Sequence, residues 1–170
     1  MSQNDILTRV DNTHIYVKGG NKEQRLLIQE CISFAKRVLM PRYRSLFINV
    51  EIGRLKNGDF GSAEWMDSNI RPREFQLLVT NIDKKTMMLT LFHEMVHVKQ
   101  MASGELKERY KDKHYRIWKE VNVYDDQDYI DCPWNFPWEI EADEWEEILY
   151  NKFIVSTGRE VKDVINNINN

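Results

Sequence analysis

The sequence predicts an α+β fold, and three observations support this prediction. The chain has 170 residues, a usual size for one domain with its own core. Its composition, 42% hydrophobic and 30% charged, is typical of a folded globular protein. Long segments with helical periodicity alternate with short segments in which every second residue is apolar. We therefore expect a single domain over residues 1–170, in which helices pack on a small mixed sheet.

The N-terminal part of the chain is expected to form an arm or strand followed by a helix. Residues 1–20 contain a short alternating run at 14–17 that ends at two glycines, which is compatible with a first strand or an ordered arm. Asn21 is a suitable N-cap, and apolar residues recur with helical spacing along residues 27–39 until Pro41 ends the pattern. This pattern predicts an amphipathic helix.

Three segments after this helix are expected to be strands. Residues 46–52 alternate, are rich in β-branched side chains and stop at Gly53. Residues 60–66 follow a turn sequence and are rich in small side chains, which favours the edge of a sheet. Residues 75–80 form another short apolar run. With or without the N-terminal strand, we expect a three- or four-stranded mixed sheet.

The next predicted helix contains the most informative motif of the sequence. The helix is expected to start after Asp83 and to end near residues 102–104. Residues 93–97 read His-Glu-Met-Val-His, an HExxH pattern. On a helix His93 and His97 lie one turn apart on the same face, so both imidazoles can reach one Zn²⁺ ion, while Glu94 projects beside them toward a metal-bound water. The alternative is two histidines on an otherwise packed helix.

Residues 104–137 are expected to form an irregular connection, because mixed charges and prolines interrupt regular patterns there. Within it, residues 114–118 could add a strand or a hairpin arm, and residues 124–131 are interpreted as an acidic loop. Cys31 and Cys132 lie far apart and belong to no CxxC motif, so no disulfide framework is predicted and Cys31 is expected to be a reduced core residue.

A last long helix is expected over residues 138–150. Pro137 is well placed at its start, and acidic side chains are favoured in its first turn. Residues 161–165 could form a further short helix, and residues 166–170 are expected to be frayed.

A third ligand is needed to complete a catalytic zinc site, which normally has three protein ligands and one open position. Glu139 is the strongest candidate, because Glu139 and Asp143 share a helix face one turn apart. One carboxylate could bind the metal while the other accepts the remaining N–H of a ligating imidazole. Glu141 and His114 remain alternative ligands.

Two stretches of the sequence carry a family resemblance. Residues 93–97 followed by residues 139–143, Glu-Ile-Glu-Ala-Asp, resemble the HExxH plus ExxxD pattern of gluzincin metallopeptidases. Residues 91–100 and 137–142 also resemble small SprT-like metallopeptidases of bacteria and phages.

The gluzincin resemblance implies a zincin-like fold, with an active-site helix and a C-terminal ligand helix. It also implies that Glu139 is the metal ligand and that Asp143 supports a ligand. In SprT proper the third ligand is a downstream histidine, for which this chain offers His114. That histidine is followed by Tyr115 instead of the expected glycine, and the chain has no terminal cysteine ribbon.

The function implied by this resemblance is that of a zinc-dependent metallopeptidase, an endopeptidase acting on a peptide or protein. Glu94 would take a proton from the metal-bound water and pass it to the leaving amine. One alternative is a non-catalytic zinc-bound zincin scaffold that serves as a protein-binding or regulatory module. Another is a SprT-like DNA-associated protease, which a net charge of −3 and the lack of a basic stripe disfavour.

The expected location is the cytoplasm. The first residues lack the basic and apolar segments of a signal peptide, and no apolar run is long enough to cross a bilayer. The sequence does not indicate an oligomeric state.

Overall fold

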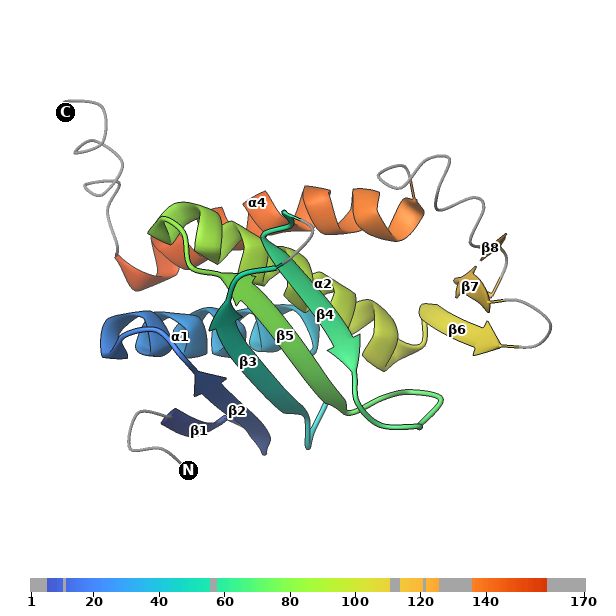
Figure 1. Cartoon of the computed structure of the whole chain (residues 1–170), viewed down its shortest axis with the longest axis horizontal. Coiled ribbons are helices and arrows are strands. Elements are labelled where there is room, and N and C mark those ends of the chain that lie inside the picture. The colour runs from blue at the N-terminus through green and yellow to red at the C-terminus, as the bar shows by residue number, and fades with distance from the viewer. Residues whose placement is uncertain are drawn as a thin grey trace.

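The computed structural model describes residues 6–10, 12–55, 58–110, 114–120, 122–125 and 136–158. Within these residues the chain has an α+β architecture of three helices and two β-sheets, as the sequence predicts (Figure 1). The predictions for residues 126–131, 161–165 and 166–170, and for Cys132, lie outside the described residues.

The larger sheet has five strands in the order β1-β2-β3-β5-β4. The central strands β2, β3 and β5 are parallel, and the two edge strands are antiparallel to their neighbours. In the register of the parallel strands, Ile48 lies opposite Ile15 and Phe75, and all three side chains are fully buried. The strands are β1 (Ile6–Val10), β2 (Thr13–Lys18), β3 (Phe47–Gly53), β4 (Gly61–Trp65) and β5 (Glu74–Thr80).

The sequence predicts a sheet of three or four strands, and the observed sheet has five. The prediction is therefore wrong, because it misses the strand β1. This strand forms an antiparallel hairpin with β2, in which Ile6 lies opposite Val17. Asn12, in the turn between them, has φ 63°, a left-handed conformation that asparagine tolerates better than most residues. The predicted edge position of residues 60–66 is confirmed, because β4 is the last strand of the sheet.

The helices α1 (Lys22–Leu39) and α2 (Lys84–Ser103) cover one face of this sheet, and α4 (Pro137–Thr157) packs along α2 (Figure 1). One side chain from each helix meets at their junction: the rings of Phe34, Phe92 and Phe153 lie 5.4–6.2 Å apart in edge-to-face pairs. These contacts fix α4 beside the helix that carries the HExxH motif.

The ends of the helices follow the predicted capping signals. Asn21 caps α1 in a capping box with Gln24, and the Asp83 side chain accepts a hydrogen bond from the Thr86 N–H at the start of α2. Gly104 ends α2 with φ 78°, where a side chain would be strained. Pro137 is in the first turn of α4, as expected, but the helix continues beyond residue 150 to Thr157.

The prediction of an irregular connection at residues 104–137 is also wrong for much of its length. Three antiparallel strands form a second sheet there: β6 (Leu106–Tyr110), β7 (His114–Trp118) and β8 (Asn122–Asp125). The mixed charges that suggest a solvated loop include cross-strand partners, since Glu108 lies opposite Arg116 and binds it at 3.2 Å. A small aromatic cluster of Trp118, Phe136 and Trp138 joins this sheet to the start of α4.

Two further sequence predictions can be compared with the structure. Cys31 is fully buried in the core, as the sequence predicts. Within the part of the chain that the structure describes, no helix is both long enough and apolar enough for a membrane span.

Candidate metal centre

The two histidines of the HExxH motif lie side by side on α2. Their Nε2 atoms are 3.0 Å apart, and their ring planes are tilted by 75°. The neighbouring turns of α2 are anchored in the core by fully buried side chains such as Leu91 and Met95. The helix therefore presents both imidazoles at one position on its surface.

The helix α4 brings a carboxylate to the same position. Glu139 is in its first turn, and its Oε2 atom lies 3.4 Å from His93 Nε2 and 3.2 Å from His97 Nε2. Ligand atoms that bind one ion at about 2.0–2.2 Å with tetrahedral angles are separated by roughly 3.3–3.6 Å. The observed spacings of 3.0–3.4 Å are close to this range, so these three side chains fit a shared metal ion.

Glu94 lies beside this group in a cleft of about 540 Å³. The exposed fraction of this residue is only 6%. One wall of the cleft is the start of β4 and the residues before it, and the other wall consists of α2 and α4. Gly61 of β4 lies directly against Glu94, because a Cβ atom placed on this glycine would be 2.7 Å from Glu94 Oε1. The strand therefore leaves room for the carboxylate only because residue 61 has no side chain.

The other ring nitrogen of His93 faces two carboxylates of α4. His93 Nδ1 is 3.2 Å from Asp143 Oδ1 and 3.3 Å from Glu146 Oε2. The Glu146 side chain is 27% exposed and lines the cleft, whereas the Asp143 side chain is 67% exposed. Either carboxylate can accept the Nδ1 hydrogen and leave Nε2 available to a metal.

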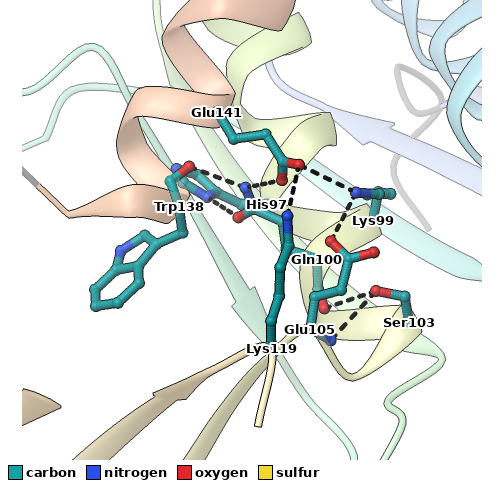
Figure 2. A network of polar contacts seen from close by, with 8 residues as sticks. All are labelled: His97, Lys99, Gln100, Ser103, Glu105, Lys119, Trp138 and Glu141. Carbon is teal, nitrogen blue, oxygen red and sulfur yellow. Dashed lines mark hydrogen bonds and ion pairs between the residues drawn. The ribbon is translucent and has the colours of Figure 1, made fainter. Parts of the chain in front are cut away.

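The other ring nitrogen of His97 faces a buried amide (Figure 2). His97 Nδ1 is 2.8 Å from Gln100 Oε1. The Gln100 amide nitrogen donates to the Trp138 carbonyl and to Glu141 Oε2, each at 2.9 Å. Both of these partners are acceptors, so the amide oxygen must face His97, and His97 must carry a hydrogen on Nδ1.

The charges of the site favour a cation. Burial lowers the pKa of His93, but its hydrogen bonds to Glu139 and Glu146 outweigh burial and raise the pKa to about 10. Burial raises the pKa of Glu139, yet the two imidazoles lower it to about 2. With no metal bound, the cluster therefore stabilises a protonated imidazole next to an ionised carboxylate. A metal ion would compete with protons for the imidazole nitrogens.

Glu94 differs from Glu139 in its electrostatic surroundings. Burial raises the pKa of its carboxyl group to about 6, although the nearby imidazoles act in the opposite direction. A carboxylate whose pKa lies near neutrality can accept and release a proton during a reaction.

The two alternative ligands from the sequence, Glu141 and His114, lie elsewhere. The Glu141 carboxylate binds Gln100 and is 3.3 Å from Lys119 Nζ (Figure 2). His114 is on β7, with its Nε2 atom 3.3 Å from Glu108 Oε2. Among the described residues, the groups of potential ligand atoms that meet within 4.8 Å are His93, His97 and Glu139, and His93, Asp143 and Glu146.

Gln100 and Glu146 are the site residues that the sequence reasoning misses. A signal for each is nevertheless present, since Gln100 follows His97 by three residues and Glu146 follows Glu139 by seven, both spacings of one helix face.

Comparison with protein-family models, curated protein sequences and solved structures finds no match to this chain.

Proposed function

We propose that this chain is a zinc-dependent metallopeptidase that hydrolyses peptide bonds in a peptide or protein. The observation that supports this proposal most directly is the convergence of His93 Nε2, His97 Nε2 and Glu139 Oε2 within 3.0–3.4 Å of one another. Two imidazoles and one carboxylate form a donor set that catalytic zinc sites use. We also propose that the protein is located in the cytoplasm.

The arrangement of elements supports a zincin-like form of the α+β fold. The helix with the HExxH motif lies under a mixed sheet whose edge strand β4 is antiparallel to its neighbour, and a later helix supplies the third candidate ligand. The gluzincin resemblance of residues 93–97 and 139–143 implies this same order of parts.

The chemistry proposed for the site divides between the metal and the protein. A bound Zn²⁺ ion would supply a water molecule that loses its proton near neutral pH and would polarise the carbonyl group of the substrate. Glu94 would accept the proton from this water at its carboxylate and deliver it to the nitrogen of the leaving amine. The low exposure of Glu94 shields this transfer from bulk water.

The edge of β4 is suited to hold an extended substrate. Phe60 O accepts a hydrogen bond from Thr80 N, and Met66 N donates to Glu74 O. Because hydrogen bonding alternates along an antiparallel pair, the N–H and C=O groups of Gly61, Ala63 and Trp65 point away from β5. These groups can bind the main chain of a peptide, as other sheet edges do.

The test combines metal analysis with one substitution. Protein purified without chelators is expected to contain one zinc ion per chain and to cleave an unfolded protein substrate. Glu94→Gln is expected to retain zinc and to lose hydrolysis by about 10²–10⁴-fold. An absence of stoichiometric zinc, or a Glu94→Gln variant that is as active as the wild type, would refute the proposal. Zinc without any hydrolysis would support the non-catalytic binding module instead.

A further inference from the structure

Gln100 occupies a fully buried position between α2 and the first turn of α4. Its exposed fraction is 0%, and Figure 2 shows its amide between His97, Trp138 and Glu141. A buried amide destabilises a protein by about 1–3 kcal/mol when its polar atoms have no partners. Here the amide oxygen has a partner and the amide nitrogen has two.

The three partners of this amide require a glutamine. They present one N–H donor, which is His97 Nδ1, and two acceptors, which are the Trp138 carbonyl and the Glu141 carboxylate. An amide matches this set, because it offers one accepting oxygen and two N–H groups in a single plane. A glutamate would place oxygen against both acceptors, and an asparagine would be shorter by one methylene group.

The contact with Trp138 is made to the main chain directly before Glu139. A bond to this carbonyl therefore restrains the first turn of α4, from which the Glu139 carboxylate reaches both imidazoles. The same amide restrains the His97 ring through Nδ1 and directs Nε2 toward Glu139. The Gln100 side chain thus contacts the ring of one candidate ligand, His97, and the main chain next to the other, Glu139. The two ligands come from different helices.

We propose that Gln100 is a positioning residue that holds His97 and Glu139 in their relative positions, so that the ligand group is assembled before a metal binds. This inference rests on the proposed function, because it assumes that these two residues are metal ligands. Residues that hydrogen-bond to the second polar atom of a metal ligand orient that ligand. Gln100 additionally bonds to the main chain of the helix that carries the other candidate ligand.

Glu141 holds the outer side of the amide. Its carboxylate lies 3.3 Å from Lys119 Nζ and 3.6 Å from Lys99 Nζ, so its charge is balanced while Oε2 accepts from Gln100 (Figure 2). Lys119 follows β7 directly, and the network therefore also attaches the second sheet to α4.

The first experiment measures zinc affinity in the full-length protein. Metal-free wild type, Gln100→Met and the control Gln29→Met are titrated with Zn²⁺ against a chromophoric chelator. Gln29 is a suitable control because it is also a buried glutamine, 5% exposed, but lies on α1. We expect Gln100→Met to weaken zinc binding by about 10–100-fold and Gln29→Met to leave the affinity close to that of the wild type. Equal affinities of wild type and Gln100→Met would overturn the proposal.

A second variant separates the two ligands. Gln100→Glu keeps an acceptor for His97 but removes both donors toward α4, so it is expected to bind zinc more weakly than the wild type. Wild-type affinity in this variant would show that only His97 is positioned, and would overturn the proposal for Glu139. This variant also decides the question if Gln100→Met does not fold.

A third measurement needs no metal. Hydrogen exchange of the backbone amides of residues 140–143 in metal-free protein is expected to accelerate in Gln100→Met and to stay unchanged in Gln29→Met. If the wild type binds no zinc, the proposed function fails, and this exchange rate alone decides whether Gln100 holds the start of α4. Unchanged exchange in Gln100→Met would overturn the proposal in that case.

Discussion

Gly61 of the edge strand lies in van der Waals contact range of Glu94, the proposed base. A Cβ atom at residue 61 would be 2.5 Å from Thr90 Cγ2 and 2.7 Å from Glu94 Oε1. Neither distance is compatible with normal packing, and both neighbours belong to α2. The position of the Glu94 carboxylate and the backbone of β4 are therefore linked by steric fit.

The first prediction concerns Gly61→Ala. The added methyl group is expected to displace the Glu94 side chain, to lower the free energy of unfolding by about 1–3 kcal/mol and to lower kcat/KM by roughly 10²-fold, while zinc remains bound. Urea denaturation and peptidase assays measure these effects. Gly53→Ala is the control, because a Cβ atom there meets no atom within 4 Å. Peptidase activity in Gly61→Ala equal to that of the wild type would contradict this prediction.

The second prediction concerns the third ligand. Glu139→Ala is expected to weaken zinc binding by more than the roughly 10–100-fold that changes outside the ligand set produce. His114→Ala is expected to leave zinc affinity unchanged, since His114 pairs with Glu108 on the second sheet. Chelator competition measures both affinities. A larger loss in His114→Ala than in Glu139→Ala would favour the ligand set of SprT proper.

The third prediction compares the two carboxylates at His93 Nδ1. Glu146→Ala is expected to weaken zinc binding about tenfold, and Asp143→Ala is expected to have a smaller effect. The reason is solvent screening, because the Asp143 side chain is 67% exposed and that of Glu146 only 27%. The resemblance to gluzincins assigns this role to Asp143, so the reverse order of effects would support the family pattern.

The fourth prediction concerns the pH dependence of stability in metal-free protein. The pKa of His93 is about 10 in the folded state against an ordinary value of 6.5, so the folded state binds more protons between these values. The contribution of His93 is therefore fully present below pH 6.5 and is lost as the pH rises toward 10. The ordinary pKa of Glu139 is 4.5 and falls to about 2, so its contribution is present above pH 4.5 and is lost as the pH falls toward 2.

Denaturation of metal-free wild type and His93→Gln at pH 6 and pH 9.5 tests the alkaline part. The stability difference between the two proteins is expected to shrink at the higher pH. A difference that grows with pH would contradict the proton-linked pairing of His93 with the carboxylates of α4. Acid unfolding of Glu139→Gln and of the wild type tests the contribution of Glu139. The stability difference between these two proteins is expected to shrink as the pH falls from 4.5 toward 2.

The sequence predicts the elements whose signals are local. The cap at Asn21, the cap at Asp83 and the glycine at 104 are each a property of a few neighbouring residues, and the observed helices α1 and α2 begin and end accordingly. The HExxH pattern is local as well, because its geometry depends only on helical spacing. The position of His93 and His97 on one face of α2, with Glu94 beside them, could therefore be predicted.

Features that depend on distant partners were not predictable in the same way. The strand β6 contains Lys107 and Glu108, whose charges suggest a loop until the cross-strand partner Arg116 is known. Gln100 is similar, because one of its partners is a main-chain carbonyl 38 residues away. Every residue has a main-chain carbonyl group, so the residue type at position 138 does not predict this contact.

The outer edge of β4 has a consequence for association of the protein with itself. In the described part of the chain no strand pairs with this edge, so it can accept any extended segment, including β4 of a second copy. The strand has only five residues, and its Glu64 side chain is exposed. Two such strands paired antiparallel would bring two carboxylates near each other, which disfavours dimerisation through this edge. The short length of β4 and its one exposed negative charge thus act against pairing of two copies along this edge.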